Sequence, residues 1–278
     1  MNDPHKISMT NTFAMSYAYG PKDWKSTIGH IDQKIFQAVE IPGEFLDVKD
    51  IADEFKSAGL KIINVEEPLP LPVTGSIYGQ DRNIIDKIKM QLSIMLRDIS
   101  GFPCRNVSID FGIDLAVSVK EKKDFLVDFI KEMTPVLERE KINLCIPARI
   151  PMHPPAVPED YFSLLKETMY GGIRFSADIY PHEIAKAADY EDFLKWYRFD
   201  MNLARFIYEA EAGNLLVEKI MENWFAAFEK TAYRGPIIFC PKISSPDHYI
   251  SESERLAELI KSFKTRKKPV KQPDEARC

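Results

Sequence analysis

Short apolar runs with strand character alternate with amphipathic helical stretches along nearly the whole chain, and this alternation most restricts the folds open to it. Some runs are apolar throughout, as in Ile237-Ile238-Phe239-Cys240, which is typical of a strand buried on both faces. The predicted strands span residues 7–13, 36–41, 61–66, 106–111, 142–148, 172–179, 194–200 and 236–240.

Helix start and stop signals stand between these strands. Asp81 and Gly101 bracket a long amphipathic stretch, so we predict a helix that Asp81 caps. Ser118 and Ser251 are each followed three residues later by a glutamate, a capping box that predicts a helix start. Asn214 is placed to open a further helix.

Eight strand-then-helix units in a chain of 278 residues match the number and size of a (β/α)8 barrel. A doubly wound sheet is the main alternative, but it usually needs fewer strands, and no glycine-rich turn follows the first strand. We therefore predict an α/β fold, a single TIM barrel over residues 1–264, with a polar, basic tail over 265–278.

Composition restricts the partners and the compartment. Apolar residues make up 45% of the chain and charged residues 28%, which excludes a disordered chain. The net charge of −5 disfavours polyphosphate, so we expect no nucleic-acid partner. No apolar run approaches the roughly 20 residues of a spanning helix, no signal peptide begins the chain, and the four cysteines form no CxxC pair. These features predict a cytoplasmic protein without a membrane partner.

Several segments, taken in order, resemble the xylose isomerase-like barrel superfamily. They are Gln37-Ala-Val-Glu40-Ile-Pro, Ala58-Gly-Leu-Lys-Ile-Ile-Asn64, Asp81-Arg82, Ile173-Arg-Phe-Ser-Ala-Asp178 and Ala232-Tyr-Arg-Gly-Pro-Ile-Ile-Phe239. That superfamily includes sugar isomerases, sugar 3-epimerases, inositol-pathway dehydratases and AP endonucleases. The resemblance covers about the whole barrel and implies its fold.

Many members of the superfamily hold a divalent metal with carboxylates and histidines at the ends of strands five to eight. The resemblance implies Asp178 as one ligand, with His182 as a shifted second. The fifth strand ends without a glutamate, and Cys240 stands about where the eighth-strand glutamate would be. The metal site is therefore degenerate, and we expect either no cofactor or weakly bound Mn²⁺ or Mg²⁺ at Asp178 and His182.

Polar side chains at the carboxyl ends of the strands are the candidate site, because TIM barrels build their sites there. The catalytic candidates are Glu40 or Asp178 as base and His182 as acid, although Asp178 and His182 could instead be a helix cap and an exposed histidine. The candidates for substrate binding are Glu66, Asp110, Arg149, His153, Asp200, Arg205 and Trp24.

Each binding candidate has a structural alternative. Glu40 and Glu66 either bind substrate hydroxyls or form ion pairs with Arg149, Arg174 or Arg198. Arg149 and Arg205 could clamp a carboxylate of the substrate or merely balance charge. Trp24 could be an aromatic platform for a sugar or a packing residue.

The resulting hypothesis is a sugar isomerase or epimerase that acts on a small polyhydroxylated or carboxylated substrate by proton transfer next to a carbonyl. A barrel that has lost catalysis and binds a carbohydrate or a partner protein is the alternative, since fold alone is a weak guide to function. An AP endonuclease is a remote third, because its metal cluster and basic surface are missing. Related barrels often form dimers or tetramers, so the resemblance is also compatible with a homo-oligomer.

Overall fold

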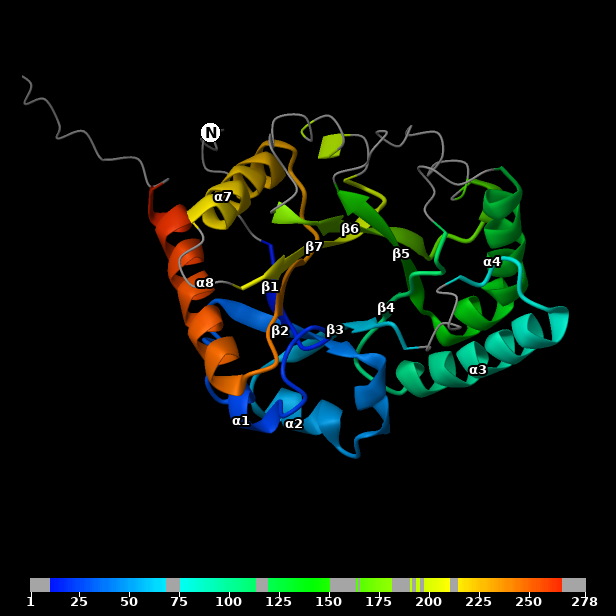
Figure 1. Cartoon of the computed structure of the whole chain (residues 1–278), viewed down its shortest axis with the longest axis horizontal. Coiled ribbons are helices and arrows are strands. Elements are labelled where there is room, and N and C mark those ends of the chain that lie inside the picture. The colour runs from blue at the N-terminus through cyan, green and yellow to red at the C-terminus, as the bar shows by residue number, and fades with distance from the viewer. Residues whose placement is uncertain are drawn as a thin grey trace, which may run out of the picture.

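Eight parallel strands close into a barrel in chain order, with β1 hydrogen-bonded to β8 (Figure 1). The computed structural model describes residues 11–68, 76–113, 120–150, 164, 166–181, 191, 194–195, 198–210 and 215–266. The strands are β1 (Phe13–Ser16), β2 (Phe36–Pro42), β3 (Lys61–Glu66), β4 (Asn106–Ser108), β5 (Asn143–Ile150), β6 (Ile173–Ile179), β7 (Met201–Glu209) and β8 (Ile237–Lys242). The predicted (β/α)8 barrel is confirmed.

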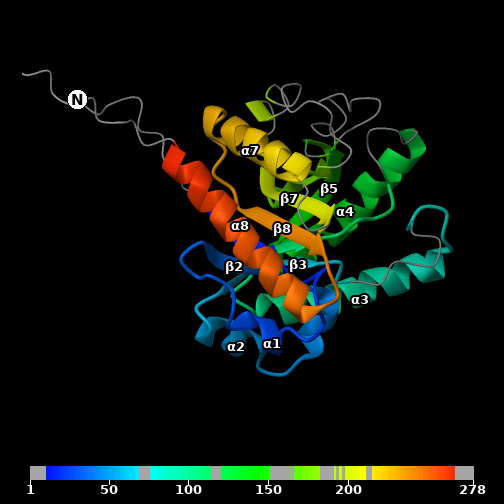
Figure 2. The ribbon, with the colours of Figure 1, turned by 60° about the vertical axis from the view of Figure 1, so that its left-hand side comes forward.

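Helices surround the barrel (Figures 1 and 2). They are α1 (Lys25–Ile28), the 3-10 helix η1 (Gly43–Asp47), α2 (Ile51–Ser57), α3 (Arg82–Ser100), α4 (Lys120–Glu140), α7 (Leu215–Lys230) and α8 (Pro246–Arg266). Asp81 and Gly101 flank α3 as predicted, but the side chain of Asp81 makes no capping hydrogen bond. The predicted start near Ser251 is wrong, because Pro246 and Asp247 open α8 a turn earlier, where a proline costs no hydrogen bond and an acidic group favours the helix dipole.

The seventh strand is the main error in the predicted bounds. The sequence favours 194–200, whereas β7 is Met201–Glu209. Asn202 and Arg205 break the apolar run of this strand, and both point to the inside of the barrel, where they bond to other polar groups. The first strand begins at Phe13 and not at residue 7, and residues 1–10 lie outside the described part of the chain. Residues 267–278 of the predicted tail also lie outside it, whereas residues 265 and 266 belong to α8, which continues to Arg266.

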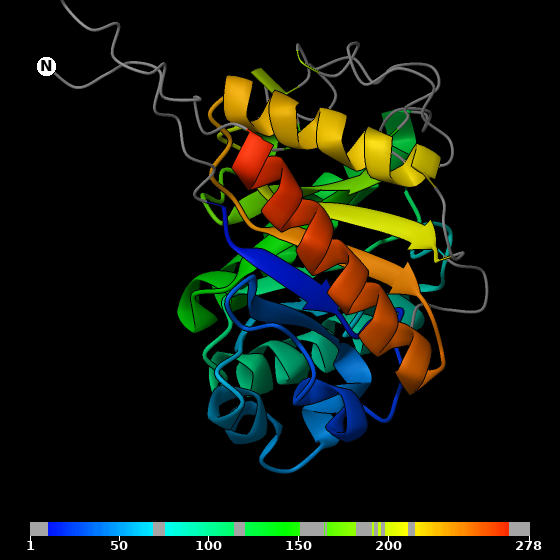
Figure 3. The ribbon, with the colours of Figure 1, turned by 90° about the vertical axis from the view of Figure 1, so that its left-hand side faces the viewer.

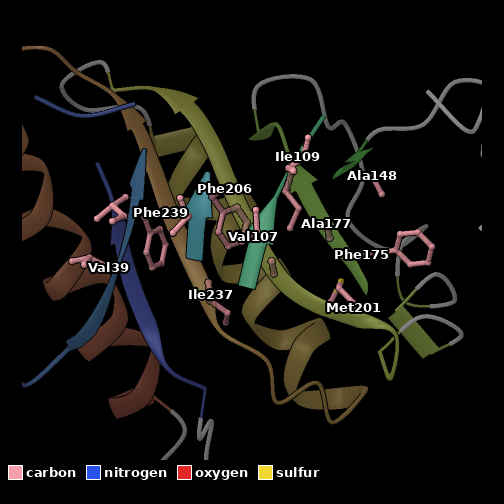
Figure 4. Packing of buried hydrophobic residues seen from close by; sticks show 14 of the residues in the cluster. Val39, Val107, Ile109, Ala148, Phe175, Ala177, Met201, Phe206, Ile237 and Phe239 are labelled. Carbon is pink, nitrogen blue, oxygen red and sulfur yellow. The ribbon is translucent and has the colours of Figure 1, made fainter. Parts of the chain in front are cut away.

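Aromatic side chains on the outside of the barrel fasten α7 and α8 to it. The rings of Phe206 and Phe239 stack with centroids 5.7 Å apart (Figure 4). Phe225 of α7 packs edge-on against Phe239 and, at 5.3 Å, against Phe263 of α8. In Figure 3, α8 runs diagonally in front of β1 and β8, and α7 lies above them next to β7; the arrowheads of these three strands point the same way. Such aromatic pairs contribute about 1 kcal/mol each beyond their buried area.

The inside of the barrel is unusually polar. A small apolar cluster consists of Ala14, Ala38, Cys145, Leu203, Ile207, Ile238 and Cys240. Near the amino ends of the strands, Asn106 accepts hydrogen bonds from Asn143 and Asn202 at 3.0 and 2.7 Å. Buried charges lie near the carboxyl ends, which together form the barrel mouth. The polar layers are what position the candidate site.

Among the described helices, none combines the length and the apolar character that crossing a membrane requires.

Gly43, directly after β2, allows a close approach that shapes the mouth. A Cβ there would stand 2.2 Å from Pro68 Cα and 2.8 Å from the carbonyl oxygen of Glu67. We expect Gly43→Ala to lower the free energy of unfolding, measured with urea, by about 1–3 kcal/mol through overpacking. Gly29→Ala is the control, since no atom lies within 4 Å of that Cβ. Equal stability of both variants would contradict the close approach.

Candidate functional site

Arg205 of β7 lies at the centre of the barrel mouth and is 1% exposed. Its Nε and Nη2 donate hydrogen bonds of 2.8 and 2.6 Å to the two oxygens of Asp178 on the adjacent strand β6. Ser176 donates a further bond of 2.7 Å to Asp178. This two-point pairing is the strongest geometry open to a guanidinium and a carboxylate.

The third nitrogen of the guanidinium reaches across the barrel. Nη1 of Arg205 lies 3.4 Å from Glu40 Oε2 on β2 and forms an ion pair with Glu66 at the end of β3. Burial lowers the pKa of Arg205, but Asp178, Glu66 and Glu40 outweigh it and raise this pKa well above its usual value. We call these four residues the arginine-centred cluster. Ion pairing is one of the two alternatives predicted for Glu40 and Glu66, but the partners expected there are Arg149, Arg174 or Arg198 and not Arg205.

Glu40 is fully buried, and both its oxygens accept hydrogen bonds. Ser16 Oγ and Asn64 Nδ2 each donate at 2.6 Å, and the Cys240 thiol donates at 3.6 Å. Burial, and then the nearby Glu40, raise the pKa of Cys240 well above its usual value, so the thiol keeps its proton. Glu40 therefore offers no exposed oxygen to a substrate.

A cavity of about 770 Å³ opens beside the cluster, between the ends of β1, β2 and β3 and the outer helix α3. Its volume suits a small molecule. Both Glu66 and the next residue, Glu67, line it, together with Tyr19. The charged side chains in its wall are Lys22, Glu44, Asp47, Glu66, Glu67 and Asp98. The cavity is therefore acidic.

Glu67 has two unusual features. Its φ of 44° lies in the left-handed region that residues other than glycine rarely adopt, and such strain clusters at functional sites. Its carboxylate accepts a hydrogen bond of 2.7 Å from the amide of Asp110. Burial raises the pKa of Glu67 to about 7, with smaller and opposed contributions from Asp110, Arg205 and Asp178. Glu67 is not among the predicted site residues, although two glutamates in tandem at a strand end are a signal in the sequence.

Glu66 is the least satisfied member of the cluster. Within the described residues, its Oε2 faces Arg205 without a hydrogen bond of regular geometry, and Tyr19 OH lies 3.5 Å from Oε1. Burial raises the pKa of Glu66 well above its usual value, and Glu40 and Asp178 add to this against the opposing charge of Arg205. Burial therefore opposes the charged form of Glu66, whereas the ion pair with Arg205 supports it.

Two other predicted residues lie near the mouth. Arg149 of β5 is exposed, and its guanidinium lies 4.6 Å from the centre of the Tyr180 ring. Asp110 follows β4 and is also exposed, and its carboxylate accepts a hydrogen bond from the amide of Gly112 at 2.8 Å. Asp110 thus positions Glu67 through its backbone.

Four predicted residues lie elsewhere or outside the described chain. Asp200 precedes β7 and so lies at the amino ends of the strands, because the seventh strand begins later than predicted. Trp24 is 4% exposed and stacks on Phe55 of α2 at 5.1 Å, so it packs under a helix and offers no platform at the mouth. His153 and His182 are outside the described residues, and the pairing of His182 with Asp178 stays a prediction.

The described residues at the mouth do not offer a donor set that fits a divalent metal. Within the described ranges, no three His, Cys, Asp or Glu side chains group to hold one. Both oxygens of Asp178 are bound to Arg205, and the protonated thiol of Cys240 is bonded to Glu40. Thiolates and free carboxylates are the forms that bind metals, so this donor set is unsuitable.

Solved structures with this fold include sugar epimerases. A 3-keto-D-glucoside 4-epimerase from E. coli superimposes with a TM-score of 0.68 at 14% identity, covering 90% of this chain and 99% of that one. An L-ribulose 3-epimerase gives 0.68 at 12% identity over 96% of this chain and 100% of that one. An AP endonuclease of family 2 from Brucella melitensis gives 0.63 at 14% identity, over 86% and 95%.

These likenesses show the fold of xylose isomerase-like barrels, as the sequence resemblance implies. No protein-family profile matches the chain, and no curated protein matches it.

The raised pKa of Glu67 predicts a specific dependence of stability on pH. In the folded chain the pKa of Glu67 is about 7, above the ordinary 4.5. The proton on Glu67 therefore contributes fully to the free energy of unfolding below about pH 4.5, and this contribution is lost as the pH rises through 7. Glu67→Gln stays neutral throughout. We expect its stability relative to wild type, measured by urea unfolding, to rise by about 2 kcal/mol between pH 4.5 and 8.

The matched control is Glu254→Gln, on the exposed side of α8. This variant should follow the wild-type profile throughout the pH range. A constant difference between Glu67→Gln and wild type across that range would show that Glu67 titrates as an ordinary surface carboxylate.

Proposed function

We propose that this barrel is a sugar isomerase or epimerase that binds an uncharged polyhydroxylated carbonyl compound in the acidic cavity. The observation that carries the proposal is a substrate-sized cavity with Glu66 and Glu67 in its wall, one of which has a pKa of about 7. A general base works best when its pKa lies near the working pH.

Glu67 is the proposed base. When ionised, it takes the proton from the carbon next to the substrate carbonyl, and the electron pair of that C–H bond moves toward the carbonyl oxygen. Glu66, whose pKa is raised by burial, is the proposed donor of a proton to that oxygen as negative charge develops, which gives an enediol. An isomer forms when Glu67 returns its proton to the former carbonyl carbon and Glu66 takes the hydroxyl proton from the carbon that lost its hydrogen. An epimer forms when water delivers a proton to the opposite face of the original carbon, Glu66 recovers its proton from the enediol oxygen, and Glu67 releases its proton to water.

The charge of the cavity restricts the substrate. The acidic side chains disfavour a phosphate or a carboxylate on the ligand, and Arg205, which was a candidate carboxylate clamp, is bound to the protein's own carboxylates. The proposed substrate is therefore the polyhydroxylated and not the carboxylated member of the predicted pair. The sugar epimerases with the same fold support this choice.

A binding-only barrel is the second candidate. The observation that favours it is the engagement of Glu40 and Asp178, two predicted catalytic residues, in hydrogen bonds within the protein. Such a barrel would bind a sugar in the same cavity without proton transfer.

Solvent deuterium distinguishes the two. We expect the wild type, in D₂O with D-psicose, D-tagatose, L-ribulose or a 3-keto-glucoside, to incorporate deuterium next to the carbonyl, detected by NMR. Glu67→Gln should slow incorporation by roughly 100-fold or more, the usual contribution of a general base. Glu254→Gln should retain the wild-type rate.

Thermal shift with the same sugars completes the experiment. Stabilisation without deuterium incorporation would establish the binding-only barrel. Neither stabilisation nor incorporation with any sugar of the panel would contradict both candidates. Equal rates in Glu67→Gln and wild type would remove Glu67 from the mechanism.

A further inference from the structure

We propose that the Arg205 guanidinium is a built-in cation that takes the place of a divalent metal ion at the centre of this barrel. The barrel then neither binds nor needs a metal between β2, β3, β6 and β7. This inference does not rest on the proposed function, because it concerns what holds the carboxylates together and not what they do to a substrate.

Arg205 occupies the place where carboxylates from three strands converge. Asp178 lies beside it, and Glu40 and Glu66 lie across the barrel. All four side chains are at most 7% exposed. Carboxylates buried together in this way repel one another and require a cation among them.

The guanidinium of Arg205 already occupies the oxygens of Asp178. A metal ion would need the lone pairs of these oxygens, which accept hydrogen bonds from Nε and Nη2 of Arg205 at 2.8 and 2.6 Å. The guanidinium cannot give up its proton in a protein, so it does not release these oxygens at any working pH. A metal could enter only by displacing a fully buried arginine.

Neutral donors support the carboxylates that the guanidinium pairs with. Ser16 and Asn64 each donate a hydrogen bond of 2.6 Å to Glu40, and Ser176 donates one of 2.7 Å to Asp178. Arg205 and these donors together therefore supply the stabilisation that a metal ion would otherwise give to the buried acids.

The test uses the full chain, freed of metals with a chelator, and Mn²⁺ alone as the probe. We expect the wild type to show no Mn²⁺ binding tighter than about 1 mM by calorimetry, and no change in Tm with Mn²⁺ or with chelator. Arg205→Ala should lose roughly 10 °C in Tm, since three acids lose their cation. Mn²⁺, but not NaCl at equal ionic strength, should restore part of this loss.

Arg205→Lys is the companion variant, because it keeps one positive charge at this place. It should retain more of the wild-type Tm than Arg205→Ala and gain nothing from Mn²⁺. If Arg205→Ala does not fold without metal, its recovery in folded form when refolded with Mn²⁺ gives the same support.

Three results would overturn the proposal. One is stoichiometric Mn²⁺ binding by the wild type that Asp178→Asn abolishes. Another is an Arg205→Ala variant as stable as the wild type, and the third is an Arg205→Ala variant that is destabilised, or unfolded, and unaffected by Mn²⁺. None of these measurements involves turnover, so failure here and failure of the proposed reaction are distinguishable.

Discussion

The ion pairing of one buried arginine is the constraint on which the arrangement of the barrel mouth depends. A guanidinium keeps its charge in a protein interior, and burying it costs several kcal/mol unless anions and hydrogen bonds surround it. Arg205 meets this requirement with carboxylates from β2, β3 and β6. The register of the four strands must therefore place these groups at the same height along the barrel axis. Their ion pairs connect opposite sides of the barrel.

The same cluster explains where chemistry can occur. Asp178 and Glu40 are bound within the protein and covered, so the reactive carboxyl groups are those that border open space. Glu66 belongs to the cluster and also to the wall of the cavity, and Glu67 follows it. The site is consequently displaced from the barrel axis toward β1, β2 and β3. Its acidity comes from the end of β3 with the following Glu67, from η1 and from α3.

The alternation of strands and helices was enough to predict the barrel, because period and strand number are local properties of the chain. The seventh strand was misplaced for a physical reason: Asn202 and Arg205 are polar residues whose partners are distant in sequence, so they resemble loop residues. The partner of Glu40 could not be predicted, since no spacing shows which side chains meet across a closed barrel. Glu67 was missed because burial and a positive φ are properties of the folded chain.

The cluster joins residues from opposite ends of the chain, and this has a consequence for biosynthesis. Glu40 and Glu66 leave the ribosome long before Arg205, so the emerging amino-terminal half carries acidic groups whose counter-charge does not yet exist. A half barrel of β1 to β4 cannot bury them at an acceptable cost and would remain open to water. The barrel therefore cannot close before β7 supplies Arg205. The native state forms late and in one cooperative step, which depends on contacts between residues far apart in the sequence.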